Sequence, residues 1–129
     1  MPLSHHEAGK ITGYHAHIYY DAESREAARA VRLGIEGRFR CVLGRWHDQP
    51  VGPHPKAMYQ VAFEVDEFAK IVPWLMLNRR GLDILIHPNT EDTIKDHDAN
   101  PIWLGTKLAL DIDTLRRFSV EQAKKIAAG

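Results

Sequence analysis

The sequence has little cysteine, no net charge and no long apolar run, and each absence excludes a class of function. Its single cysteine, Cys41, cannot form a disulfide within the chain, and its apolar neighbours favour a buried small side chain over a reactive thiol. The 17 basic and 17 acidic residues cancel, so the charge of a nucleic-acid or membrane-surface binder is missing. Neither a run of about 18 apolar residues nor a secretory leader is visible. We therefore expect a cytoplasmic protein whose partner is a small molecule or a second copy of the chain.

Length and composition predict one globular domain. The chain has 129 residues, of which 44% are hydrophobic and 26% are charged, enough for one apolar core. Residues 1–12 begin with a polar stretch that carries Pro2 and Gly9, and we expect a flexible leader there. Residues 13–129 are then the single folded domain.

Hydrophobic periodicity predicts an α+β fold of the ferredoxin-like type. The predicted elements are a strand at 14–20, a helix capped by Asp21 that ends near Gly37, strands at 38–46 and 57–65, a helix capped by Asp66 and kinked or restarted at Pro73, and a strand at 82–87 ended by Pro88. This βαββαβ order predicts an antiparallel sheet with both helices on one face. A C-terminal extension follows, with a short strand on Leu108, Leu110 and Ile112 and a helix opened by Ser119 and Gln122.

Most of the eight histidines lie in short clusters near the ends of these elements. Alternation places His15 and His17 opposite the apolar face of the first strand, and His87 likewise on the fourth. His54 lies in a stiff proline loop before the third strand. With a sheet order of four, one, three, two, and with strand three expected to run parallel to strand one, we expect these four histidines to meet on the helix-free face.

Converging imidazoles predict a metal site or an acid/base site, because neutral histidine is the commonest metal ligand and the usual general base. An isolated histidine on a strand is more often a hydrogen-bonded structural group. His97 either folds back to join the others or is exposed, and His47 is interpreted as structural. Arg45 and Arg79 either hold a substrate carboxylate or pair locally.

Six segments together resemble the small DOPA 4,5-dioxygenase family. They are YHAHIYYD at 14–21, PVGPHP at 50–55, WLMLNR at 74–79, LIHP at 85–88, DH at 96–97 and WLG at 103–105. The resemblance implies a ferredoxin-like fold, commonly a homodimer, and extradiol cleavage of a catechol such as DOPA by non-haem Fe(II) and O₂. It implies metal binding among His15, His17, His54 and His87, an acid/base role for His97 or His17, and substrate binding by Arg79 and Arg45.

The iron assignment leaves alternatives open. The usual non-haem iron site adds a carboxylate to two histidines, whereas Glu64 and Asp83 lie toward the far ends of their strands. An all-histidine site would also suit zinc or nickel. A metal-dependent hydrolase or isomerase is therefore an alternative. A second is a non-catalytic dimeric binding module that pairs through an apolar patch of Tyr19, Met58, Ala62 and Leu85 on the helix-free face.

Overall fold

The computed structural model describes residues 4–119, which form one five-stranded sheet in the order β2-β3-β1-β4-β5. The elements are a 3₁₀ turn Ala8–Lys10, β1 Gly13–Tyr20, α1 Arg25–Glu36, β2 Val42–Leu43, β3 Ala57–Phe63, a 3₁₀ turn Val65–Glu67, α2 Phe68–Asn78, β4 Ile84–Asn89, α3 Thr93–Asp98 and β5 Ile102–Leu104. The predicted ferredoxin-like fold is confirmed, and β5 extends its sheet by one strand. None of the helices in residues 4–119 is long and apolar enough to cross a bilayer.

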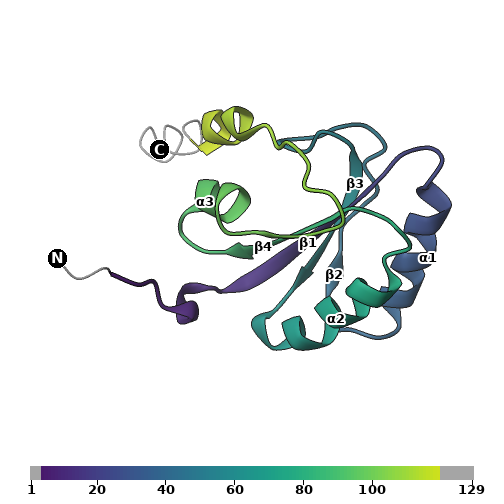
Figure 1. Cartoon of the computed structure of the whole chain (residues 1–129), viewed down its shortest axis with the longest axis horizontal. Coiled ribbons are helices and arrows are strands. Elements are labelled where there is room, and N and C mark those ends of the chain that lie inside the picture. Colours follow the sequence, from purple (N-terminus) through teal and green to yellow (C-terminus); the bar gives the residue numbers. More distant parts are fainter. Residues whose placement is uncertain (1–3, 120–129) are drawn as a thin grey trace.

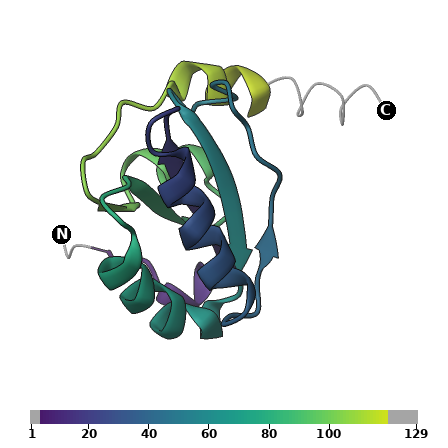
Figure 2. The ribbon, with the colours of Figure 1, turned by 90° about the vertical axis from the view of Figure 1, so that its right-hand side faces the viewer.

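The central strand β1 divides its side chains between two faces as predicted. Ala16 and Ile18 are fully buried in the main core, under α1 and α2, which cover that face of the sheet (Figures 1 and 2). His15, His17 and Tyr19 point to the second face, where α3 lies (Figure 1). The period of two in the sequence therefore sets which residues of β1 belong to the core and which to the other face.

The predicted direction of the third strand was wrong. β3 runs antiparallel to β1, with Ala57 opposite Tyr20 and Phe63 opposite Tyr14. Because α1 returns the chain to the end of the sheet where β1 began, β2 runs parallel to β1, and β3, antiparallel to β2, is antiparallel to β1 as well. The loop before β3 thus lies beside the end of β1, and it must fold over the second face to bring His54 toward His17.

Several element boundaries also differ from the sequence prediction. Only Val42–Leu43 of the stretch 38–46 pairs in the sheet, although Phe39, Cys41 and Leu43 face the core as expected. The Asp21 carboxylate accepts a hydrogen bond from the Ser24 amide, so it closes a turn before α1. α2 continues through Pro73. β4 continues through Pro88 because β5 begins opposite Ile86, which leaves Pro88 at an edge position that needs no N–H donor.

The second face of the sheet is covered by the chain's own C-terminal part. Trp103, Leu108 and Leu110 pack against the buried residues Tyr19, Met58 and Leu85. The predicted strand on residues 108–112 was wrong: Asp111 accepts hydrogen bonds from the amide and hydroxyl of Thr114, and residues 112–119 are helical. Ser119 therefore lies inside a helix already begun, and Gln122 is outside the described residues.

Residues 103–110, the covering segment, change the argument for a dimer. Met58, Leu85 and Tyr19 are 5%, 0% and 1% exposed and Ala62 is half-buried, so most of the apolar patch expected to hold two copies together is not available on the surface. Side chains of the same chain cover it. The homodimer stays a prediction of the sequence resemblance, without this patch as its support.

Candidate metal centre

Five histidines from four separate segments gather on the second face of the sheet. His15 and His17 come from β1, His87 from β4, His54 from the proline loop and His97 from α3. The ring centre of His17 lies 4.2 Å from that of His54 and 5.2 Å from that of His87. The His87 ring lies 5.1 Å from His15 and 4.1 Å from His97. The predicted meeting of the histidines is confirmed, and His97 joins them.

Three of these side chains present donor atoms close enough for one metal ion. One ring nitrogen each from His15, His17 and His87 lies within 4.8 Å of the other two. Their positions follow from the register, because His15 is opposite His87 across the β1–β4 ladder and His17 is two residues further along the same face. The Nε2 atoms of His17 and His87 are 3.2 Å apart. Two ligands of one ion at bond lengths of about 2.1 Å are themselves separated by about 3.0–3.4 Å.

The orientation of His87 is set by its own backbone. Its Nδ1–H donates to the carbonyl oxygen of Pro88 at 2.9 Å, which leaves the lone pair on Nε2, the atom that faces His17. A metal-binding imidazole is usually held in this way by a carbonyl on its other nitrogen. The Nδ1 atom of His17 is buried and has no hydrogen-bond partner among residues 4–119.

His54 and His97 flank the three donors, and each is anchored through Nδ1. His54 Nδ1 shares a 2.7 Å hydrogen bond with the hydroxyl of Tyr19, whose ring stacks on Trp103. His97 Nδ1–H donates to the carbonyl oxygen of Thr93 at 2.8 Å, so its Nε2 is free. Both rings are held through Nδ1, and the Nε2 atom of each stays available to a ligand or a proton.

A buried carboxylate holds the turn that carries His97, and both of its oxygen atoms accept hydrogen bonds within that turn. Asp96 accepts from the Thr90 amide at 2.7 Å and from the Thr90 hydroxyl at 2.6 Å. The two other candidate carboxylates point elsewhere: Asp83 accepts from the Thr106 amide, and Glu64 is exposed. Within the described residues, the donor set of the cluster is therefore imidazole alone.

Burial keeps the central imidazoles uncharged at neutral pH. Desolvation, followed by repulsion from His97, lowers the pKa of His87 to about 3 and that of His54 to about 4. The pKa of His17 is held well below its usual range, first by burial and then by the neighbouring histidines, and that of His15 is lowered by burial and by His97. Neutral imidazole is the form that binds metal.

The predicted arginines lie apart from the cluster. Arg79 donates from Nη1 to the carbonyl oxygen of Leu82 at 2.8 Å, before the start of β4, whereas His87 lies toward the other end of that strand. Arg45 is exposed beyond β2, the edge strand, which β3 separates from β1. The backbone of His47 pairs with that of Met58 in an isolated β-bridge, and the structural role of its side chain stays a prediction. Arg79 directly follows the last residue of α2, and its side chain makes a local contact with the backbone there.

Sequence reasoning missed the supporting role of Tyr19. We expected it in an exposed patch, yet it is buried and bonded to His54. The alternation of β1 already placed Tyr19 on the histidine-bearing face, and that was the available signal. Its partner comes from the proline loop, so the contact itself depends on how that loop folds.

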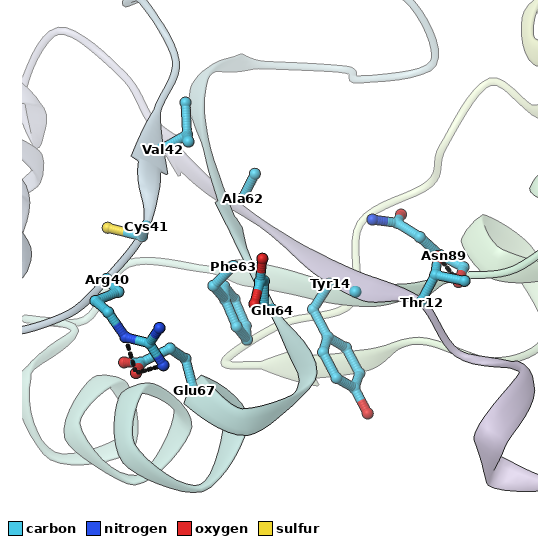
Figure 3. Close-up of a pocket in the computed structure, with 11 residues that line it drawn as sticks. Thr12, Tyr14, Arg40, Cys41, Val42, Ala62, Phe63, Glu64, Glu67 and Asn89 are labelled. Carbon is cyan, nitrogen blue, oxygen red and sulfur yellow. Dashed lines mark hydrogen bonds and ion pairs between the residues drawn. The ribbon is translucent and has the colours of Figure 1, made fainter.

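A cleft elsewhere on the molecule has no histidine in its lining. It measures about 350 Å³ and lies between the start of β1, the start of β2 and the end of β3. Figure 3 shows Arg40 turned toward Glu67 at one end and Thr12 with Asn89 at the other. The buried Glu67 carboxylate is paired with Arg40 at 3.3 Å and Lys70 at 3.5 Å. The Glu67 carboxylate is therefore paired with two cations.

Comparison with known proteins gives a consistent group of relatives. The sequence model of the Dopa 4,5-dioxygenase family matches residues 14–114. An uncharacterized 21.2 kDa protein of Botryotinia fuckeliana is 33% identical over 91% of this chain and 70% of its own length. A DOPA 4,5-dioxygenase of Amanita muscaria is 33% identical over 82% of this chain, which spans half of that protein's length. A candidate dioxygenase of Nostoc punctiforme, solved by crystallography, is 55% identical with a TM-score of 0.87, covering 88% of this chain and 99% of that one.

Proposed function

This chain belongs to the Dopa 4,5-dioxygenase family, and on that premise we propose that it is an extradiol dioxygenase, which opens a catechol ring with non-haem Fe(II) and O₂. The observation that carries the proposal is the group of three imidazole donors within 4.8 Å. The Amanita relative, a DOPA 4,5-dioxygenase, supports a catechol as the substrate. In such a reaction both oxygen atoms of O₂ enter the product and one carbon–carbon bond breaks, so no external reductant is consumed.

We propose that His15, His17 and His87 hold the metal. The 3.2 Å separation of two Nε2 atoms, the carbonyl that orients His87 and the lowered pKa values of the imidazoles all fit a metal ion. When bound, Fe(II) would supply the redox chemistry that activates O₂ toward the ring of the bound catechol. Three protein ligands leave the remaining coordination positions for these two reactants.

The flanking histidines supply the acid/base function in this proposal. With Nδ1–H donating to the Tyr19 oxygen, His54 keeps a lone pair on Nε2 and can accept a catechol proton there. His97 keeps the same atom free, because its Nδ1–H donates to Thr93. The His54 site is nearly closed to water, as His54 is 7% exposed, whereas His97 is half-buried.

The test is ring opening by the iron-loaded chain. Protein loaded with Fe(II) without oxygen is mixed with a catechol and then with air, and we expect the yellow colour of a semialdehyde. The same chain loaded with Zn²⁺ has no redox activity and should give no colour. A chain that binds iron yet leaves every catechol unchanged would contradict the proposal.

One observation favours a second candidate. The cluster offers only imidazoles among its described donors, which also suits Zn²⁺ in a metal-dependent hydrolase. In that case the zinc-loaded chain would hydrolyse ester or lactone probes, and the iron-loaded chain would have no advantage with catechols. The two loaded forms therefore separate the candidates.

A further inference from the structure

A small cleft adjoins the histidine cluster on the side of α3. It measures about 180 Å³ and lies between the end of α3 and the covering segment. Six residues that line it matter here: His97, Asp98, Trp103, Lys107, Leu108 and Leu110. Leu108 and Leu110 are packed against the sheet, so this wall of the cleft is fixed by the fold.

Two residues connect the cleft directly to the cluster. His97 lines the cleft, and its ring is 4.1 Å from that of His87. Trp103 also lines it and stacks on Tyr19, which holds His54. One molecule can therefore reach from the donor atoms into the cleft. A cavity of about 150 Å³ holds benzene, so the cleft has room for a ring or a short side chain but for little more.

Two side chains of opposite charge line the cleft. Lys107 and Asp98 are its charged lining residues and form no salt bridge with each other. The nearby donors are imidazoles without a carboxylate partner, so a divalent cation bound by them would keep its full positive charge. That field attracts an anion and repels an ammonium group. Lys107 adds to the attraction, and the single carboxylate of Asp98 opposes it only in part.

We infer that this cleft is the subsite for the substrate's side chain, and that Lys107 binds a carboxylate on it. The inference rests on the proposed function, and it narrows the substrate to a catechol with a short acidic side chain. Leu108 and Leu110 would contact the methylene groups, and Lys107 would contact the acid. In this arrangement Lys107 determines which catechols bind, because it selects those with an acidic side chain.

Binding can be measured without turnover, because Zn²⁺ has no redox chemistry. Calorimetry on the full, zinc-loaded chain would compare 3-(3,4-dihydroxyphenyl)propionate, the neutral 4-ethylcatechol and the cationic dopamine. We expect the acid to bind more tightly than both. Lys107→Gln should weaken the acid about fivefold, the effect of losing a partly exposed ion pair, and leave 4-ethylcatechol unchanged. Lys107→Glu should reverse the preference between the acid and dopamine. Lys95→Gln, an exposed lysine on α3, is the matched control and should change nothing.

The outcomes distinguish a failure of this inference from a failure of the proposed function. If the acid and 4-ethylcatechol bind equally in every variant while the iron-loaded chain still opens catechols, the inference is wrong and the proposed function stands. Dopamine binding more tightly than the acid in the unmodified chain would also overturn it, in favour of Asp98. If no catechol binds at all, both the inference and the proposed function fail.

Discussion

The Nε2 atoms of His17 and His87 lie 3.2 Å apart, although 70 residues separate them in the chain. Both side chains are almost completely buried, at 3% and 1% exposed, and neither is balanced by a carboxylate. Among residues 4–119 the two facing Nε2 atoms have only each other as partners, and an apolar interior disfavours polar atoms that lack strong partners. A shared metal ion would provide that partner, which is why the pair is central to the proposed function.

Removing either member of this pair should remove the metal. We expect His17→Ala and His87→Ala to retain less than about a tenth of the wild-type iron, since even loss of an outer-shell partner commonly costs about 10–100-fold in affinity. Iron content of anaerobically purified protein is the measurement. His6→Ala changes an exposed histidine near the N-terminus and should keep the full content. Equal iron in all three variants would place the metal elsewhere.

Tyr19 should position His54 rather than bind metal. Tyr19→Phe removes the 2.7 Å hydrogen bond, so we expect slower ring opening, unchanged iron content and a loss of about 1 kcal/mol in the free energy of unfolding. The matched control is Tyr14→Phe on the same strand, because the Tyr14 hydroxyl has no hydrogen bond to any described residue. Should both variants open catechols at the wild-type rate, the Tyr19 contact would have only a structural role.

Acid should destabilise the metal-free protein over a defined range. The pKa of His54 falls from 6.5 to about 4 on folding, and that of His87 falls to about 3. Below pH 6.5 the unfolded chain binds protons that the folded chain refuses, so stability is complete above that pH and is lost as the pH falls toward 4. Each histidine contributes a slope of up to about 1.4 kcal/mol per pH unit. Urea unfolding at several pH values measures it, and His54→Gln should flatten the curve.

Helix packing can be tested with two glycines of the first helix region. A Cβ on Gly34 would lie 2.6 Å from the Trp74 ring, whereas one on Gly37 would meet nothing within 4 Å. Gly34→Ala should therefore lower the free energy of unfolding by about 1–3 kcal/mol through overpacking. Gly37→Ala should leave it unchanged or raise it by up to about 1 kcal/mol. Thermal unfolding of the two variants gives the comparison, and equal stability would mean that α1 and α2 pack less closely.

Sequence patterns predicted the faces of the strands well, because side-chain direction alternates strictly along a strand. The division of β1 into Ala16 and Ile18 on one face and His15 and His17 on the other follows from that period alone. The sheet order then places β4 beside β1, and the observed register puts His15 opposite His87. This much of the candidate site depends on local rules.

Other parts of the site depend on long-range contacts that no local pattern encodes. His54 reaches the cluster over the end of β1, not beside its start, because the loop before β3 folds back. The hydrophobic alternation of Leu108 and Leu110 suggested a strand, but these side chains cover Tyr19 and Leu85 without backbone pairing. The same alternation fits both outcomes, so the sequence could not separate them.

The most direct test of the metal centre is a crystal grown without oxygen from the iron-loaded chain, with diffraction recorded at the iron absorption edge. The account predicts one anomalous peak on the second face of the sheet, about 2.1 Å from a ring nitrogen of each of His15, His17 and His87. A peak at another site, or iron bound in solution with no peak among these three histidines, would contradict it.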